Sequence, residues 1–469
     1  MQLAYAAVMA RLLEPQAFGL IAGAMLAIKF VTYPAKFGVS AALIQRPHLD
    51  DRDLRVAFSI SLAAGAAGTL LVLVISTPLS HILGQPGVAS VSRWLGVTLV
   101  LGAFATVPEA LLRKRMQFRS LTIINIGVYF CSNILIAIPL AMANIGAMSL
   151  VVAVIANVAL SAVFLSLISS FKPRLAFDVI RAKKFAGFGG LVAITSLLDV
   201  ISSSADTAVV GRMGASQLGQ YSRSTFLVSL PVEQVSSAAN RVIAPGLSQL
   251  QSDSARFGSA LTVSLGLTAC LVAVPIAVAA AVASELVPLA LGPGWGLAAK
   301  VLPFVSASSG MGLITQVITS ASDARGAVRQ RFCVQLMSVV VIVAAVATAA
   351  AVFGTPLAVA IAWMCGEVFR LAAHSLLAVK WLSVPLNDLV SRFFNAAILG
   401  VFAGTPGFLI IHQLGWNGIG ALAAALAGAA LLLAALWLLW PSAPYRLDIK
   451  RLNLKQTRLT LKREHTNDN

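Results

Sequence analysis

Long apolar runs dominate the pattern of hydrophobic and polar positions along the chain. Runs of twenty or more apolar residues recur from one end to the other, and the segments between them are too short to fold as soluble domains. The runs are continuous rather than alternating with period two, which excludes a membrane β-barrel. The pattern therefore predicts an all-α polytopic membrane protein with about 14 transmembrane helices.

Short polar or Gly- and Pro-containing segments separate the predicted helices. The first helix would be about 20 Å long at 1.5 Å per residue, short of a ~30 Å hydrocarbon core, so either the start is truncated or this helix is partial. The predicted ranges are 1–13, 18–45, 55–83, 90–112, 119–143, 146–170, 185–211, 217–247, 257–285, 297–321, 331–353, 356–379, 391–413 and 417–440.

Composition and charge support this class and add an orientation. Hydrophobic residues make up 58% of the chain and charged residues 11%, far from the balance of a soluble domain. A net charge of +17 in a soluble protein would suggest nucleic acid, but here most of the 34 lysines and arginines lie in alternate loops, so no nucleic-acid partner is predicted. By the positive-inside rule, these loops and both chain ends are predicted to face the cytoplasm. The main basic segments are 46–55, 113–119, 172–184, 325–331 and 446–463.

A short internal repeat predicts how the helices are grouped. "ARLLEPQAFGL" at 10–20 and "GRMGASQLGQY" at 211–221 share an arginine and a hydrophobic residue followed by glycine, Phe18-Gly19 and Leu218-Gly219. The offset is six helices, which suggests two pseudosymmetric six-helix lobes related by an axis along the membrane normal, as in transporters. The predicted organisation is an N-lobe at 1–170, a basic cytoplasmic linker at 171–184, a C-lobe at 185–380, two further helices at 381–440 and a basic cytoplasmic tail at 441–469.

The motifs of common catalytic sites are missing from the sequence. It contains no Walker A sequence, H-E-x-x-H pair or G-x-S-x-G elbow. The five histidines are far apart, and the four cysteines have no C-x-x-C spacing. We therefore predict a protein that is not an enzyme and that uses neither a cofactor nor a metal.

Ionisable residues at membrane depth are the candidate functional residues. A charge at the centre of a span costs about 2.5–3.5 kcal/mol on insertion scales, so these side chains should face the interior of the helix bundle. Lys29 and Lys36 are seven residues apart and therefore share a helix face, as do Asp199 and Asp206. The other such residues are Arg223, Glu233, Arg241, Glu367 and Arg370.

These residues have different competing explanations. Glu367 and Arg370 are three apart on one helix and most simply form an ion pair. Arg223 and Arg241 lie within about two turns of the ends of their helix, so snorkelling to the interface competes equally with a cavity role. Lys29 and Lys36 have no acidic neighbour on their own helix.

From this comparison we predict substrate binding by Lys29, Lys36, Arg223 and Arg241. We predict charge balance or cation coupling by Asp199, Asp206 and Glu233.

Several loop segments resemble a known family. "ARLLEPQAFGL", "FGVSAALIQRPHLDDRDLRVAF", "VPEALLRKRMQFRSL", "DTAVVGRMGASQLGQYSRS" and "NRVIAPGLSQLQSD" resemble, in order and spacing, the polysaccharide transporter (oligosaccharide flippase) family of the multidrug/oligosaccharidyl-lipid/polysaccharide exporter superfamily. The resemblance implies a bacterial inner-membrane protein of fourteen helices, with two lobes around a central cavity. It also implies movement of undecaprenyl-pyrophosphate-linked oligosaccharide. Where relatives often carry an acidic or polar residue before Phe-Gly, this chain has Lys36.

The predicted function is therefore a flippase that rocks two lobes around a cationic cavity, for exopolysaccharide or lipopolysaccharide biosynthesis. Its expected partners are the lipid-linked oligosaccharide, the bilayer, and a polysaccharide polymerase with its assembly proteins. A drug/cation antiporter of the same superfamily is an alternative that would favour a cavity rich in carboxylates. A membrane-embedded polymerase or glycosyltransferase would need a sizeable extramembrane loop, and a non-transporting scaffold would not need the many buried charges.

Overall fold

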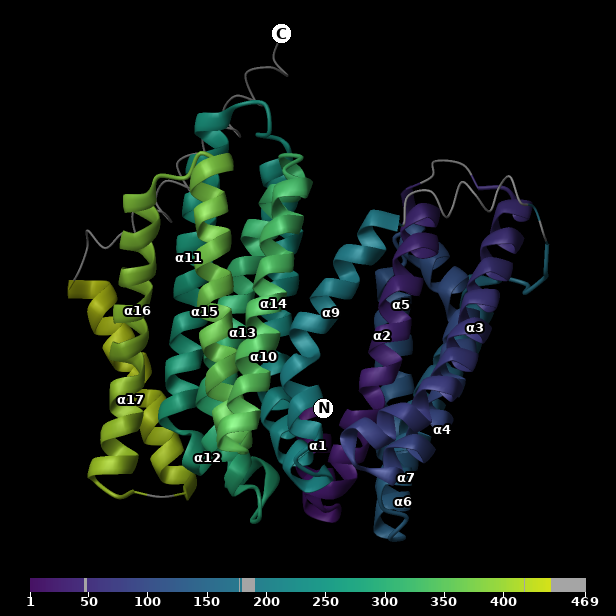
Figure 1. The fold of residues 1–469 in the computed structure, drawn as a ribbon, viewed down its shortest axis with the longest axis horizontal. Coiled ribbons are helices and arrows are strands. Elements are labelled where there is room, and N and C mark those ends of the chain that lie inside the picture. Colours follow the sequence, from purple (N-terminus) through teal and green to yellow (C-terminus); the bar gives the residue numbers. More distant parts are fainter. Residues whose placement is uncertain (46–48, 177, 179–189, 417, 440–469) are drawn as a thin grey trace. The chain divides into compact units, whose positions relative to one another are not determined.

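The computed structural model describes residues 1–45, 49–176, 178, 190–416 and 418–439 (Figure 1). Throughout these ranges the regular elements are helices, which confirms the all-α class, and ten of the described helical segments are long and apolar enough to cross a membrane. The helices are α1 Gln2–Leu12, α2 Pro15–Gln45, α3 Asp51–Leu83, α4 Pro86–Lys114, α5 Phe118–Tyr129, η1 Phe130–Ala137, α6 Ile138–Met142, α7 Ala147–Ser169, α9 Gly190–Gly211, α10 Ala215–Ser248, α11 Ser254–Ala281, α12 Ala283–Leu291, α13 Gly296–Ala324, α14 Val328–Phe353, α15 Pro356–Trp381, α16 Leu386–Phe408, η2 Leu409–Gln413 and α17 Gly418–Leu439.

The chain forms two compact units. Unit 1 comprises Met1–Arg223 with Val343–Val359, and unit 2 comprises Ser224–Ile342 with Ala360–Asn469. The division between them falls within α10, after Arg223. Part of the predicted linker and the whole predicted tail lie outside the described residues, and the predicted lobe boundaries stay a prediction.

In unit 1, α3 lies beside α4, and α4 also packs on α2 and α7 (Figure 1). The reversal between α3 and α4 is specified locally. Gly84 adopts a left-handed conformation with φ of 64° at the C-cap of α3, and Pro86 begins α4, where its missing N–H costs nothing. Helix α2 packs along α9, so that residues from the start and the middle of the chain meet in one unit.

The two glycines of the sequence repeat meet at a close backbone crossing. A Cβ atom on Gly19 would lie 1.8 Å from the carbonyl oxygen of Ala215, and one on Gly219 would lie 1.7 Å from the carbonyl oxygen of Pro15. The contacts are reciprocal, since each glycine faces the backbone four residues before the other. Only glycine permits this approach of the first turns of α2 and α10 within unit 1.

In unit 2, α11 packs against α13 and α16, and α16 lies beside α17 (Figure 1). The core of this unit is built around Phe257, Leu261 and Leu265 of α11, which are fully buried. The side chain of Asp253 caps the start of α11 by accepting a hydrogen bond from the N–H of Arg256 at 3.1 Å. Unit 2 therefore has its own apolar core.

Three predicted helices differ in detail from the structure. The span predicted at 391–413 ends in the π-helical segment η2. The span predicted at 257–285 ends at Ala281, and a separate helix α12 follows. The span predicted at 119–143 contains the π-helical segment η1. Within η1, Asn133 Nδ2 donates to the Tyr129 carbonyl at 3.1 Å, and Ser132 Oγ donates to the Val128 carbonyl at 2.8 Å. These side chains compete with the helical hydrogen-bond ladder, which hydropathy alone does not reveal.

Candidate functional site

The first part of the candidate site is a buried carboxyl group in unit 1. Asp206 of α9 is 1% exposed, and its Oδ2 accepts a 2.7 Å hydrogen bond from the hydroxyl of Tyr221. Thr207 Oγ1 donates to Asp206 Oδ1 at 3.2 Å. Tyr221 lies opposite Asp206 because α9 ends at Gly211 and α10 returns from Ala215. The two hydroxyls offset the cost of removing the carboxyl group from water.

Lys29 of α2 is the cation associated with this carboxyl group. Its side chain is exposed, and its ammonium is near enough to Asp206 to attract the carboxylate electrostatically. The packing of α2 along α9 brings the two residues together from distant parts of the sequence. The site thus combines an accessible positive charge with a buried, hydrogen-bonded acid.

Arg223 lies one half-turn beyond Tyr221 and stacks within unit 1. The carbon at the centre of its guanidinium is 4.6 Å from the centroid of the Phe18 ring, and Phe18 is only 2% exposed. A cation–π contact of this kind contributes about 0.5–2 kcal/mol. The charge of Arg223 also acts on Tyr5, whose ring meets that of Tyr129 edge-on at 6.0 Å. The guanidinium therefore lies against one aromatic ring, with the hydroxyl of Tyr5 within electrostatic range.

Two of the remaining predicted residues have side chains that the structure describes. Asp199 is half-buried on α9, and Glu233 is exposed on the part of α10 that belongs to unit 2. The side chains of Lys36 and Arg241 lie outside the described residues. Of the seven predicted residues, the structure brings Lys29 and Asp206 into electrostatic range and places Arg223 over the ring of Phe18.

Unit 2 contains a buried ion pair. Arg370 Nη2 lies 2.6 Å from Glu367 Oε2, and the two side chains are 15% and 2% exposed. This confirms the ion pair predicted from the three-residue spacing. His374, one turn further along α15, is fully buried, with its Nδ1 2.9 Å from the Arg370 carbonyl oxygen.

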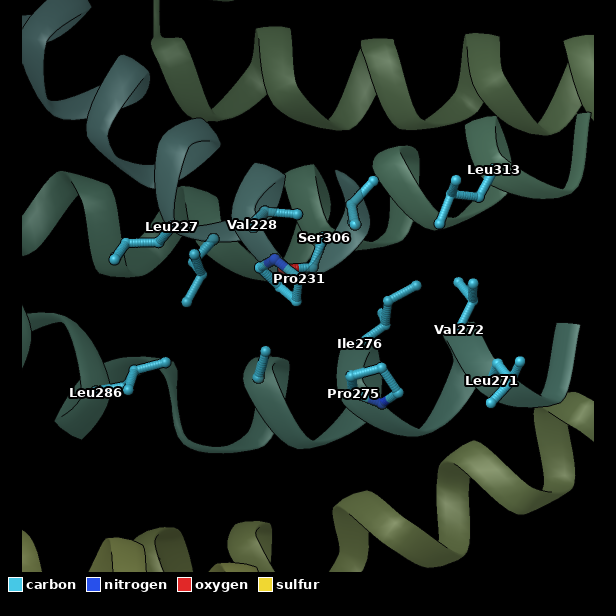
Figure 2. A pocket seen from close by; sticks show the side chains of 13 residues that line it. Leu227, Val228, Pro231, Leu271, Val272, Pro275, Ile276, Leu286, Ser306 and Leu313 are labelled. Carbon is cyan, nitrogen blue, oxygen red and sulfur yellow. The ribbon is translucent and has the colours of Figure 1, made fainter. Parts of the chain in front are cut away.

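An apolar pocket of about 630 Å³ lies within unit 2 (Figure 2). Side chains of α10, α11, α12 and α13 line it, including Pro231, Pro275 and Ile276, with Ser306 as a polar lining residue. Pro231 lies within α10 and Pro275 within α11, and a proline inside a helix removes a backbone hydrogen bond and can bend the helix. Without a charged lining residue, this pocket suits apolar groups and offers nothing to hold a phosphate.

Tyr221, Thr207 and Phe18 were not among the predicted site residues, all of which carry a charge at neutral pH. A sequence signal existed for two of them, because Phe18 and Tyr221 both lie in the repeated segments, next to Gly19 and close to Gly219. Nothing in the local sequence marks Thr207 as a partner of Asp206 beyond its adjacency.

The sequence is similar to that of known proteins. Residues 8–300 match the family described as "Polysaccharide biosynthesis protein". The chain is 26% identical over 305 residues to the succinoglycan biosynthesis transport protein ExoT of Rhizobium meliloti (strain 1021), covering 65% of this chain and 62% of that protein. It is 20% identical over 317 residues to the lipopolysaccharide biosynthesis protein WzxC of Escherichia coli (strain K12), covering 66% and 63%. The matched region thus spans less than two thirds of either relative.

Solved structures are similar over more of the chain. A lipid II flippase MurJ in an inward closed conformation aligns with a TM-score of 0.72 at 13% identity, covering 94% of this chain and 96% of that one. A multidrug resistance MATE family transporter in an inward-facing conformation aligns with a TM-score of 0.58 at 13% identity, covering 85% and 94%. At these identities the similarity establishes the fold.

Proposed function

The chain belongs to the polysaccharide biosynthesis protein family, and on this premise we propose that it is a flippase for undecaprenyl-pyrophosphate-linked oligosaccharide. It moves this lipid across the bacterial inner membrane by alternating access around a cationic cavity. The names of its relatives as polysaccharide biosynthesis and transport proteins support this proposal, as does the similarity of its fold to a lipid II flippase. The names of the same relatives support a role for the substrate in exopolysaccharide or lipopolysaccharide assembly.

The observation that carries the proposal is the position of Lys29 within electrostatic range of Asp206. Lys29 presents an accessible ammonium, which attracts a diphosphate more strongly where the surroundings are less polar than water. Asp206 is held by Tyr221 and Thr207 rather than by a direct ion pair, so its charge moderates that attraction from a distance. Moderate attraction suits a transporter, because a headgroup that is bound must also be released.

The remaining predicted residues complete the proposed cavity. Lys36 shares the face of α2 that carries Lys29, and Arg241 supplies further positive charge. Arg223, stacked on Phe18, contributes a fixed positive charge. Asp199 and Glu233 balance this charge or couple transport to a cation.

Orientation and partners belong to the same proposal. Both chain ends face the cytoplasm, in keeping with the positive-inside rule. The exported product is then available to a polysaccharide polymerase and its assembly proteins on the outer side.

The direct test is the fate of the lipid-linked oligosaccharide in cells that lack the protein. Undecaprenyl-pyrophosphate oligosaccharide is expected to accumulate at the cytoplasmic leaflet, and the cognate polymer to disappear from the cell surface. A plasmid-borne wild-type copy restores export, and a Lys29→Gln–Lys36→Gln copy at equal protein level does not. Normal polymer export in cells that lack both this protein and any redundant transporter contradicts the proposal.

A drug/cation antiporter is the second candidate, favoured by the fold similarity to the MATE transporter. The same deletion strain separates the two functions. The flippase proposal expects lost polymer with unchanged susceptibility to cationic drugs, whereas an antiporter would leave the polymer intact and raise drug susceptibility.

A further inference from the structure

A second pocket, of about 770 Å³, lies at one end of unit 1. Helix α3 begins there, and α4 and α7 end there. Its lining includes four basic residues, Arg55, Arg115, Lys172 and Arg174, and one acidic residue, Asp51. Three basic loops that are far apart in the sequence thus converge on one cavity, which the loop charges alone did not predict.

The segment after α7 is fixed where it forms the pocket wall. The ring of Phe171 lies 5.7 Å from that of Phe58 in α3, centroid to centroid. The N–H of Ala176 donates to Ser59 Oγ at 3.0 Å. Arg115 Nη1 donates to the Ser169 carbonyl oxygen at the end of α7, at 3.1 Å. Contacts from α3 and α4 therefore hold this wall in place, and Lys172 and Arg174 are presented from an ordered segment.

The charges around the pocket are not balanced by its own acidic residue. Asp51 lies 3.9 Å from Arg55, and its side chain is 89% exposed. Water screens this exposed pair, and the lining has one carboxylate for four cations, so an excess of positive charge remains. Arg115 has five N–H donors, of which the bond to Ser169 uses one. Like charges so close together repel one another, and a multivalent anion between them relieves that repulsion.

The inner side of the pocket is apolar, because Leu54, Leu111 and Phe171 belong to or pack against a hydrophobic cluster of unit 1. The pocket therefore combines a basic rim with an apolar floor. It also lies at the ends of three helices that are long and apolar enough to cross a membrane, Asp51–Leu83, Pro86–Lys114 and Ala147–Ser169. The ends of such helices lie at the depth of the lipid headgroups.

We propose that this pocket binds the phosphoryl headgroup of a membrane lipid. The phosphoryl oxygens lie among Arg55, Arg115, Lys172 and Arg174, and the adjoining apolar part of the lipid lies along Leu54 and Leu111. Arginine suits this ligand because its planar guanidinium donates two parallel hydrogen bonds to a phosphate. Two lipids share the chemistry, an anionic phospholipid and a polyprenyl diphosphate. Binding of an anionic phospholipid goes beyond the proposed function, whereas binding of a polyprenyl diphosphate as the transported lipid rests on it.

The test measures lipid binding to the purified full-length protein in detergent by native mass spectrometry. The probes are dioleoylphosphatidylglycerol, undecaprenyl diphosphate and inorganic diphosphate. The pocket variant is Arg115→Gln–Lys172→Gln–Arg174→Gln. The matched control, Arg113→Gln–Lys114→Gln–Arg119→Gln, removes three positive charges from the neighbouring end of α4 and start of α5 without touching a lining residue.

The pocket variant is expected to bind the lipid probes about a hundredfold more weakly than the wild type, the order expected for the loss of three cations near a headgroup. The control variant is expected to bind the lipid probes within about threefold of the wild-type affinity, because its three charges lie outside the pocket and are screened by salt. A charge-preserving variant, Arg115→Lys–Arg174→Lys, keeps most of the binding. It shows that a loss in the Gln variant comes from charge rather than from misfolding.

Each outcome decides the proposal. Weakened binding of both lipids supports a shared phosphoryl site, and a larger loss for one of them identifies the natural source. Equal losses in the pocket variant and the control, unchanged lipid binding in the pocket variant, or inorganic diphosphate binding as tightly as the lipids would each overturn it. Polymer export plays no part in this measurement, so failure here leaves the flippase proposal standing, and failure of the flippase proposal leaves this one standing.

Discussion

Glu367 in unit 2 and Asp206 in unit 1 are both buried carboxyl groups, yet they have different partners. Arg370, one turn along α15, binds Glu367 directly at 2.6 Å. Hydroxyl groups of Tyr221 and Thr207 bind Asp206, and its described cationic neighbour, Lys29, acts on it from a distance. The pair in unit 2 is self-neutralising, whereas the arrangement in unit 1 fixes the acid and leaves the ammonium accessible.

On the proposed function, this difference separates charge that stabilises the fold from charge that is available to a ligand. A close ion pair on one helix keeps both side chains occupied, so its removal should affect stability more than transport. A lysine whose acidic neighbour is already hydrogen-bonded by hydroxyls remains able to attract an anion. Substitutions of the ion pair in unit 2 should therefore lower stability more than export. Substitution of Lys29 in unit 1 should lower export more than stability.

The largest expected effect is on the stability of unit 2. Glu367→Ala leaves Arg370 as an uncompensated buried charge and should destabilise the protein by about 3–5 kcal/mol. Thermal unfolding of the purified protein in detergent measures this loss. The double variant Glu367→Leu–Arg370→Leu removes both charges and should recover most of the stability. If the single variant is as stable as the wild type, the ion pair is not structural and the comparison fails.

The next effect concerns the hydroxyl that holds Asp206. Tyr221→Phe leaves a buried carboxyl oxygen without its 2.7 Å donor and should cost about 1–3 kcal/mol in the same unfolding measurement. Tyr129→Phe, which removes a hydroxyl elsewhere in unit 1, is the matched control and should change stability much less. If both variants lose the same free energy of unfolding, the hydrogen bond to Asp206 contributes no more to stability than any other tyrosine hydroxyl.

Lys29 should affect export rather than stability. Lys29→Gln is expected to retain membrane insertion and the wild-type melting temperature, and to lower polymer export about tenfold, which corresponds to about 1.4 kcal/mol. Lys29→Arg keeps the charge and should restore part of the export. Lys300→Gln removes an exposed lysine from unit 2 and serves as the control. Wild-type export by the Lys29→Gln–Lys36→Gln variant would make both lysines structural.

The smallest expected effect on stability is that of Asp206→Asn. The amide oxygen still accepts a hydrogen bond from Tyr221, so the free energy of unfolding should fall by less than about 1 kcal/mol. Export should fall more clearly, because the balance between Lys29 and its neighbouring acid is lost. Export measured at matched protein level checks this, and a stability loss as large as that of Glu367→Ala would remove the distinction between the two units.

The sequence was sufficient for the helical class and for interactions within one helix. Glu367 and Arg370 are three residues apart, so helix geometry alone predicted their ion pair. The partner of Lys29 was not predictable in this way, because Asp206 reaches it only through the packing of α2 along α9. The repeat identified Gly19 and Gly219 as equivalent, but hydropathy carries no information about two backbones in contact.

The basic pocket shows the same limit of local reasoning. Arg55, Arg115 and Lys172 were recognised as loop charges that indicate topology, each in its own segment. Their convergence depends on Phe171 packing on Phe58 and on the hydrogen bond between Ala176 and Ser59, contacts between segments more than a hundred residues apart. Charge counts along the chain cannot distinguish cations that are scattered over the surface from cations that line one cavity.

The backbone crossing at Gly19 and Gly219 also determines when α2 can complete its packing during synthesis of the chain. Gly19 needs the backbone of Ala215 beside it, so the first turns of α2 cannot reach their final packing until the ribosome has made about 200 further residues. At roughly 5–20 residues per second, this takes on the order of 10–40 seconds. During that interval α2 lacks its backbone contact with α10, and a chain that stops before residue 215 cannot make it.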